Sequence, residues 1–353
     1  MITSDVGNTE KASQIAAKGQ AALNEGDTAR AQSLFREAAE ELEQQISGVR
    51  KQSDKHMLRF LAASQYYHGG LYTDAQRLCR RIQTSLLPTE VRPIFQKFSR
   101  DVNDRADPRY TEGIRAALLR HIQEPQGILD LLQAHPYVLS PADLALMRAS
   151  SCEQIKDYRA AALFSADVIR FAPETPELLF HTLALPIVLT HEGKLDEAWE
   201  YVTHQLQAIP HALTYVNASL VRGHQARLAV SNEERKALSR EQIRFFEDAW
   251  HRFQLLPSNI QAHSGIREYM VLGFEAAAFG YLRLNQPEKA RELCDRIVAL
   301  FPNVPDPLKI RDLVNSATIQ TIDGVDEDYL NARERIIRRR REETMRNLEL
   351  VGT

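Results

Sequence analysis

The residue types that carry most enzyme chemistry occur in this chain, but their spacing does not assemble a site. Cys152 with His121 or His181 would form a nucleophile–base pair only if the fold brought them together. His204 and His211 would have to share one metal ion across a helix break. The sequence has no G-x-x-x-x-G-K-[ST] loop, no G-x-G-x-x-G, no H-E-x-x-H and no C-x-x-C. We therefore expect a protein that is not an enzyme and that uses no cofactor or metal.

The elements that would position these residues are helices of one repeated kind. Ala161, Ala198 and Ala290 are each followed twelve residues later by a proline, and Ala75 is followed by Pro88 one residue later than that. Each alanine lies early in an apolar stretch with helical periodicity. Each proline lies where that helix must end, because proline lacks the N–H and clashes with the preceding turn. The recurrence of one helix pattern along a sequence is typical of a helical repeat array.

The residues around these alanines resemble the tetratricopeptide repeat, a helix–turn–helix of about 34 residues with the pattern W-x2-L-G-x2-Y, then A-x3-F, then P. In the first copy the Gly, Tyr, Ala, Phe and second Ala positions of the pattern hold Gly19, Ala22, Ala31, Phe35 and Ala38, and the turn is Gly26-Asp27. The equivalent positions of the four later copies hold Ala63, Tyr66, Gly70, Ala75, Cys79 and Ile82; Ala149, Cys152, Ala161 and Val168; Leu185, Leu189, Gly193, Ala198 and Val202; and Ala278, Tyr281, Ala290, Cys294 and Ile297. No copy keeps the tryptophan, and Pro186 replaces one glycine. The resemblance indicates the class and no subfamily.

The intervals between the repeat alanines are uneven, and each of the two long ones leaves room for one further helical pair. We expect helices over 94–102, 110–122 and 128–134 in the first, and over 213–230 and 239–256 in the second, the last opened by a capping box of Ser239 and Gln242. The resemblance then implies an all-α fold, a right-handed α-α superhelix of about seven helical pairs plus a C-terminal Arg-rich helix. The expected parts are a two-repeat module over 1–100, an irregular helical connection over 101–140, repeats with one divergent pair over 141–305, and a helical extension over 306–353.

Tetratricopeptide proteins usually bind ligands on the concave surface made by the first helix of each pair. Carried over place by place, the resemblance implies a partner-binding groove of Met57, Phe60, Tyr67, His68, Phe180, Leu183, Ile187, His191, Glu275, Phe279 and Arg283. Several of these residues are aromatic or apolar, and a bound peptide or helix would cover them. The alternative is that helix packing buries them. We do not expect a carboxylate clamp, because the matching places hold Ala16, Gln20 and Leu61, which carry no cation.

The end of the sequence carries the densest run of positive charge. Its arginines are Arg333, Arg335, Arg338, Arg339, Arg340, Arg341 and Arg346, in one expected helix. That helix reads either as a solvated cap of the repeat array or as a docking helix for an acidic partner or RNA. A general nucleic-acid binder is not favoured, because the net charge is −3 and the isoelectric point about 6.4.

Localisation and function follow by elimination. No signal peptide is visible after Met1, and the longest uncharged apolar run, 178–190, is too short to span a membrane. The three cysteines are expected to be reduced and buried, so we expect a cytoplasmic protein. The predicted function is a non-catalytic adaptor or scaffold that binds a peptide or helix of another protein. The alternatives are a peptide-sensing regulator or secretion-type chaperone of the same fold, and an RNA-binding helical array.

Overall fold

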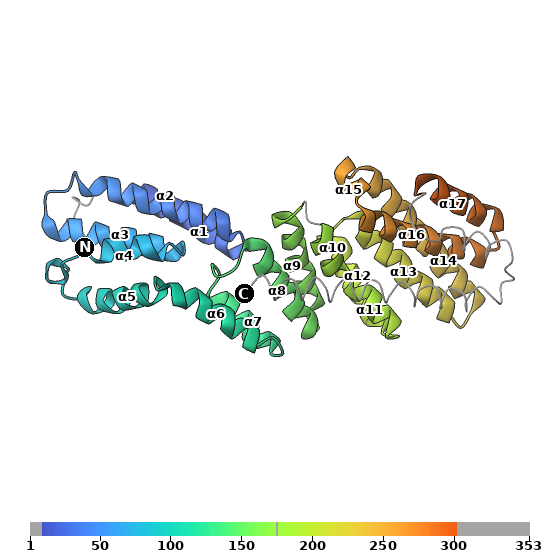
Figure 1. Cartoon of the computed structure of the whole chain (residues 1–353), viewed down its shortest axis with the longest axis horizontal. Coiled ribbons are helices and arrows are strands. Elements are labelled where there is room, and N and C mark those ends of the chain that lie inside the picture. Colours follow the sequence, from blue (N-terminus) through green and yellow to red (C-terminus); the bar gives the residue numbers. More distant parts are fainter. Residues whose placement is uncertain (1–8, 174–175, 302–353) are drawn as a thin grey trace. The chain divides into compact units, whose positions relative to one another are not determined.

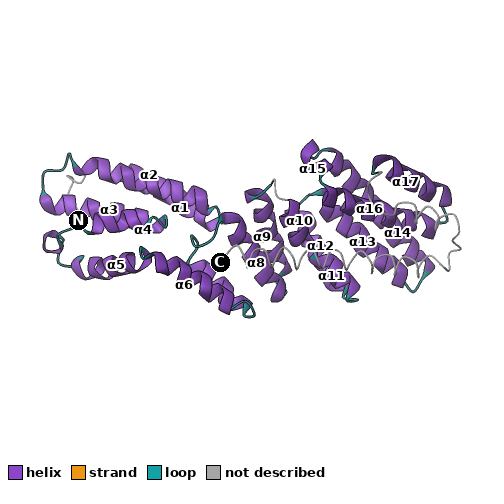
Figure 2. Cartoon of the chain, in the orientation of Figure 1, coloured by secondary structure: helices purple, strands orange, loops and turns teal. Residues whose placement is uncertain are grey.

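The computed structural model describes residues 9–173 and 176–301, which form helices joined by short turns (Figures 1 and 2). No strand occurs in this part of the chain, and the expected all-α class is confirmed. The chain divides into two compact units, Met1–Leu144 and Ala145–Thr353. The domain boundaries expected near residues 100, 140 and 305 stay predictions. The expected C-terminal helix lies outside the described residues.

Unit 1 holds the blue and teal helices of Figure 1. Their bounds are α1 Glu10–Asn24, α2 Thr28–Ile46, α3 Gln52–His68, α4 Tyr72–Cys79, α5 Arg92–Arg105, α6 Pro108–Arg120 and α7 Pro125–Ala134, with a single 3-10 turn, η1, at Thr84–Leu86. Helix α1 packs on α2, α2 on α3, α3 on α4, and α4 on α5. The core of this unit therefore lies between successive helices along the chain. Helices α5, α6 and α7 account for the three expected in the first long interval.

Unit 2 contains the green to orange helices, and α8 (Pro141–Gln154) crosses the division between the units (Figure 1). The others are α9 Tyr158–Phe171, α10 Pro176–Leu183, α11 Leu185–His191, α12 Leu195–Ala208, α13 Ala212–Leu228, α14 Asn232–Gln254, α15 Ser258–Ala262, α16 Ser264–Arg283 and α17 Pro287–Leu300. Antiparallel pairs form between α11 and α12, α13 and α14, and α16 and α17. The largest core cluster of the unit lies among α13, α14 and α16.

The repeat places predicted from the sequence are packing places in the structure. The five repeat alanines, Ala31, Ala75, Ala161, Ala198 and Ala290, have no solvent-exposed surface. Each is a small residue at a point where two helices approach closely, so a larger side chain would push the pair apart. The Tyr, Phe and Cys places of the copies are buried beside them in most cases, for example Phe35 and Cys294. The register inferred for the repeats is therefore confirmed at these positions.

The turn between the two helices of a repeat has one backbone geometry in all five copies. The residue five positions before each repeat alanine has a positive φ: 78° at Gly26, 70° at Gly70, 61° at Lys156, 76° at Gly193 and 58° at Asn285. In each turn the N–H of this residue and that of the next residue donate back to carbonyls at the end of the preceding helix. This left-handed C-terminal cap satisfies carbonyls that the helix end leaves open. Glycine adopts it freely, whereas a lysine there is strained.

Two helices depart from a regular repeat helix or from an expected start, each for a local reason. The first helix of the fourth repeat is divided into α10 and α11 at Ala184, because Pro186 cannot continue the hydrogen-bond ladder of α10. The expected start of α14 at Ser239 is wrong. The helix begins at Asn232, where the Ser231 side chain accepts the Glu234 N–H at 3.1 Å. Ser239 is buried inside the helix and its hydroxyl donates to the Arg235 carbonyl at 2.8 Å. Both serines fit the S-x-x-[EQ] pattern, so the pattern alone does not choose between them.

Replacing Ala198 by phenylalanine is expected to destabilise unit 2 by about 1–3 kcal/mol, because overpacking a closed helix contact forces side chains and backbone to shift. Ala198 is fully buried at its repeat place in α12. The measurement is the urea midpoint of the full chain. Ala237, exposed on α14, is the matched control, and its change to phenylalanine is expected to stay within about 0.5 kcal/mol. Equal losses for the two variants would contradict the close helix contact.

Candidate functional site

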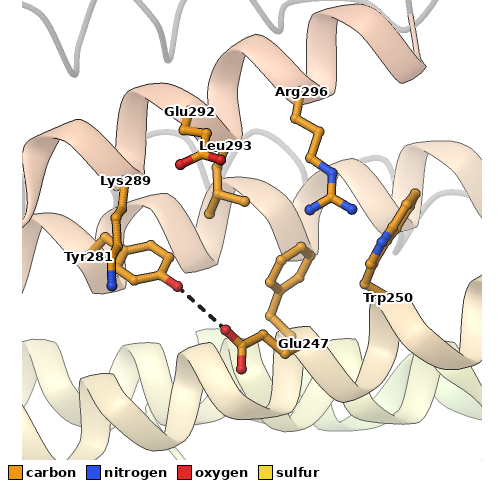
Figure 3. Close-up of a pocket in the computed structure, with 8 residues that line it drawn as sticks. Glu247, Trp250, Tyr281, Lys289, Glu292, Leu293 and Arg296 are labelled. Carbon is orange, nitrogen blue, oxygen red and sulfur yellow. Dashed lines mark hydrogen bonds between the residues drawn. The ribbon is translucent and has the colours of Figure 1, made fainter.

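A pocket of about 290 Å³ lies between α14, α16 and α17 of unit 2 (Figure 3). It combines an apolar floor, aromatic walls and charged side chains. Its lining residues are Phe246, Glu247, Trp250, Tyr281, Lys289, Glu292, Leu293 and Arg296. Its volume is sufficient for one large amino-acid side chain.

Helical spacing explains why these residues meet. Phe246 and Trp250 are four residues apart and share one flank of α14. Lys289, Leu293 and Arg296 recur at intervals of four and three, so they lie on one face of α17. Tyr281 comes from the last turn of α16, which lies between the two. The pocket is thus formed by the second helices of two successive pairs, with one residue from a first helix.

The floor and walls belong to an aromatic cluster. Phe246 and Leu293 are buried and form the floor. The Trp250 ring stacks on Phe253 with centroids 5.5 Å apart, and it meets Phe274 edge to face at 5.2 Å. Phe274 also contacts Phe246 at 4.6 Å. These contacts fix the Trp250 ring, while one part of it remains open to the pocket, since the residue is only half-buried.

Two cations of α17 lie over aromatic rings at the pocket. The guanidinium carbon of Arg296 is 4.8 Å from the centre of the Trp250 ring, and Lys289 Nζ is 5.5 Å from that of Tyr281. Figure 3 shows Arg296 extending from α17 beside Trp250. Within residues 9–173 and 176–301, neither cation forms an ion pair with a carboxylate. Their positions are held by ring contacts, so their N–H donors remain available to a ligand.

Two carboxylates balance this charge. The Tyr281 hydroxyl donates to Glu247 Oε1 at 3.5 Å, the dashed line in Figure 3. Burial raises the pKa of Tyr281, and the Glu247 carboxylate raises it further, so the phenol stays neutral and remains a donor. Glu292 lies on α17 between Lys289 and Arg296. The lining set contains no Ser, Thr, Cys or His, and its groups are suited to holding a side chain rather than to attacking one.

The predicted groove residues of unit 1 contact the chain's own helix α5. Phe60 meets Phe95 and Phe98 at centroid distances of 5.5 and 5.3 Å. Tyr67 also meets Phe98, its hydroxyl donates to Asp101, and the Arg105 guanidinium lies 5.1 Å from its ring. Met57 packs against the same core, and only His68 is exposed. These side chains are largely engaged inside the unit, and their role in binding stays a prediction.

The predicted groove residues of unit 2 are mostly interior. The buried ones are Leu183, Ile187, Glu275, Phe279 and Arg283. His191 is half-buried, with its ring 5.5 Å from that of buried His224. The side chain of Phe180 lies outside what the structure describes, as do all seven arginines of the predicted basic tail. Helices α13 and α14 pack against α16, which carries Glu275, Phe279 and Arg283. The role of the unit 2 groove residues in binding stays a prediction.

Sequence reasoning missed the pocket because it assigned binding to the first helix of each pair. One signal was available: Lys289 and Arg296 stand seven residues apart, and Leu293 lies between them on the same helical face. The second signal was Trp250, one of only two tryptophans in the chain. Neither identifies the neighbouring helix that completes a pocket.

Two of the chemical groups considered from the sequence, Cys152 and His211, have a structural explanation in the fold. Burial raises the pKa of Cys152 to about 11, so its sulfur is a thiol at neutral pH and not a nucleophilic thiolate. His211 Nδ1 accepts the Leu213 N–H at 3.2 Å and caps α13. In the described ranges no group of three or more His, Cys, Asp and Glu side chains is placed to hold a metal ion. No described helix is long and apolar enough to cross a membrane.

Comparison with known proteins adds little to this picture. No family model matches the sequence, and no curated protein matches it. Among solved structures, the crystal structure of the P58(IPK) TPR domain matches 97% of this chain and 99% of its own length, with 13% sequence identity and a TM-score of 0.24. The class therefore follows from the chain's own helices: antiparallel pairs, buried repeat alanines and a shared left-handed turn define a tetratricopeptide-like helical repeat.

Proposed function

We propose that this protein is a non-catalytic protein-interaction adaptor or scaffold, which holds a peptide or helix of another protein in the pocket of α14, α16 and α17. Helical repeats of this class generally bind proteins on the extended surfaces that their stacked helices present. The proposal places the protein in the cytoplasm. It assigns no catalytic step to any residue.

The observation that carries the proposal is that Arg296 stacks on the half-buried ring of Trp250 and forms no ion pair in the described residues. A half-buried tryptophan and an arginine without an ion-pair partner in the described residues are the residue types that most often dominate binding energy at protein interfaces. The arginine is already stacked on the ring, so little side-chain entropy is lost when it binds. The apolar floor of Phe246 and Leu293 fits an aliphatic or aromatic anchor from the partner.

The two alternative functions are less well supported. An RNA-binding array requires base-reading positions at regular spacing, whereas the repeat alanines are unevenly spaced. A secretion-type chaperone or peptide-sensing regulator of the same fold would also bind a peptide, and it differs only in the identity of the partner. An acidic partner for the C-terminal arginines remains a separate part of the proposal.

Replacing Arg296 by alanine is expected to weaken capture of the native partner at least about tenfold, as truncation of an interface arginine typically does. Proteins from an extract of the native organism would be captured on the full chain and quantified, and the retained partner then titrated for its Kd. Arg291, exposed on α17 and absent from the pocket lining, is the matched control. Both variants should keep the helical circular dichroism signal and melting temperature. Equal retention by the Arg296 and Arg291 variants would show that the pocket is not the binding site.

A further inference from the structure

The end of unit 1 at which α3 begins carries an excess of positive charge. Figure 1 shows the α2–α3 turn and the segment between α4 and α5 at this same end, because α3 and α4 run in opposite directions. A hydrogen bond joins the two segments: the Gln83 N–H donates to Nδ1 of the buried His56 at 3.2 Å. We call the six cations of these segments the basic end of unit 1. They are Arg50, Lys51, Lys55, Arg59, Arg80 and Arg81.

Carboxylates within the two segments do not balance this charge. Residues 44–59 and 78–89 hold all six cations and contain one carboxylate, Asp54. An oxygen of Asp54 lies 3.7 Å from Lys51 Nζ, and the other five cations form no ion pair within the described residues. The excess of positive charge is therefore a property of the segments themselves.

The excess persists when the neighbouring segments are counted. Residues 9–13, 40–59 and 77–97 include the start of α1, the last turns of α2 and the start of α5, and they hold ten cations against six carboxylates. Two of these carboxylates form ion pairs with cations outside the set of six. Glu41 pairs with Lys11 at 2.7 Å, and Glu43 pairs with Arg77 at 2.8 Å. Most of the charge of the basic end therefore stays uncompensated.

The six cations are accessible, and helix stability does not account for all of them. Four of them are exposed, and Lys55 and Arg59 are half-buried. Lys51 is the N-cap residue of α3 and makes no capping hydrogen bond, although side chains that accept one are favoured there. Lys51 and Lys55 also lie at the positive end of the helix dipole, which repels cations. Only Arg80 and Arg81, at the end of α4, have positions that the dipole favours.

We propose that the basic end of unit 1 binds a short acidic segment of a partner protein. Charge complementarity argues for this occupant, because several exposed cations lie at one end of the unit and lack carboxylate partners. Ile94 is 61% exposed in the first turn of α5, at the same end, and an apolar side chain of the bound segment would cover it. This surface lies in unit 1, so the inference goes beyond the function proposed for the pocket of unit 2.

A long polyanion or a membrane fits this end less well, because the charge excess is local. The rest of the described unit 1 carries more carboxylates than cations, and Glu37 and Glu40 are exposed on the neighbouring helix α2. These carboxylates repel a phosphate backbone or anionic headgroups that extend beyond the six cations. The rings of Phe60 and Phe95 contact each other inside the unit at 5.5 Å, so they offer no open faces for stacked bases.

The test titrates the full chain into a fluorescently labelled acidic peptide and follows the anisotropy of the label. The peptide consists of Glu, Asp and Leu and is about nine residues long, or about 30 Å when extended. Titrations at about 0.05 M and about 0.15 M salt measure the electrostatic part of binding, which the higher salt screens more strongly. The other probes are a Gln–Asn–Leu peptide of equal length, an oligouridylate, and vesicles of phosphatidylcholine with phosphatidylserine.

We expect the acidic peptide to bind more tightly than the other three probes, and to bind more weakly at the higher salt. Arg80→Gln with Arg81→Gln should weaken its binding at least about tenfold, because two uncompensated cations are lost. Asp54→Asn should tighten it a few-fold, because this change removes a like charge. The matched control is Arg109→Gln with Arg120→Gln, which removes two exposed cations of α6 in the same unit and should leave the Kd unchanged.

The C-terminal arginines also attract an acidic peptide, so a further double variant locates the binding site. Arg339→Gln with Arg340→Gln should leave the Kd unchanged, because these residues do not belong to the basic end. The helical circular dichroism signal and the melting temperature of each variant confirm that it is folded.

Four results would overturn the proposal. They are an unchanged affinity after Arg80→Gln with Arg81→Gln, an equal loss in the α6 control, a loss confined to the C-terminal variant, and tighter binding of the oligouridylate or the vesicles. Arg296→Ala in the pocket should leave this Kd unchanged and weaken capture of the native partner. Failure of this proposal is therefore distinguishable from failure of the pocket.

Discussion

Unit 2 is expected to lose stability as the pH falls below about 6.5, by up to about 1.4 kcal/mol per pH unit for each histidine that is buried in the neutral form. Urea unfolding of the full chain at a series of pH values between 7 and about 4.5 would measure this slope. At the acid end the expected loss from one such histidine is about 2–3 kcal/mol, which is a large part of the stability of an ordinary domain.

The cause is the position of His224 in α13. Burial, together with the smaller effect of the nearby charges of His191, Arg227 and Arg283, lowers the pKa of His224 to about 3. In the unfolded chain the same group has a pKa near its ordinary value of 6.5. Between these two values the unfolded chain binds a proton that the folded chain does not. Stability is therefore fully present above pH 6.5 and declines as the pH falls toward 3.

His224→Gln should remove this part of the slope, because glutamine does not titrate. Burial also lowers the pKa of His211, to about 4, so a second part of the slope should remain in that variant and vanish with His211→Gln. His251, exposed on α14, is the matched control for histidine removal. Carboxylates with lowered pKa values, such as Glu197, also stabilise the fold, but that contribution is lost mainly below about pH 4.5, outside the pH range of the experiment. An unchanged slope after His224→Gln would contradict the buried neutral state.

The packing of the repeats could be predicted from the sequence because it depends on residue size at fixed spacing. Ala75, Ala161 and Ala290 have no room for a larger side chain. Small residues that recur at a fixed spacing can be recognised in the sequence, and helices that cross closely require them. The proline that follows each alanine marks the end of its helix for a reason that is also local. Local causes of this kind need no knowledge of the neighbouring helices.

The turn conformation was only partly predictable. In the sequence, Gly26, Gly70 and Gly193 indicate a left-handed backbone conformation, because glycine adopts positive φ freely. Asn285 tolerates it, but Lys156 gives no such signal. The repeat register required the turn there, and the helix pair imposes it on a residue that disfavours it.

The candidate site was not predictable because it depends on which face a neighbouring helix covers. Phe279 and Phe60 carry the same aromatic side chain at first-helix places, yet the first is buried in unit 2 and the second is half-buried against α5. The repeat pattern gives the direction of each side chain within its own pair. The pocket at Trp250 and Arg296 arises from the spacing between α14 and α17, which no single helix encodes.

The replacement of Phe274 by alanine is expected to cost about 3–5 kcal/mol of unfolding free energy, the usual loss for a fully buried phenylalanine. Phe274 has no exposed surface and contacts Phe246, Trp250 and Phe301, with ring centroids 4.6, 5.2 and 6.0 Å away. Removing its ring opens a cavity beneath the pocket and releases Trp250, in addition to the lost transfer free energy. Urea unfolding followed by circular dichroism measures the loss.

A second measurement, the fluorescence of Trp250, and a control variant at the exposed Leu163 test whether the loss of stability comes from the aromatic cluster. Because the Trp250 ring meets Phe274 edge to face, its emission should shift in the folded variant, in a Trp199→Phe background that leaves Trp250 as the only tryptophan. Leu163→Ala on α9, where the side chain is 55% exposed, should change stability by no more than about 0.5 kcal/mol. A loss below about 1 kcal/mol for Phe274→Ala would mean that the aromatic cluster does not hold α14 and α16 together. The pocket would then lack the fixed floor on which its proposed function depends.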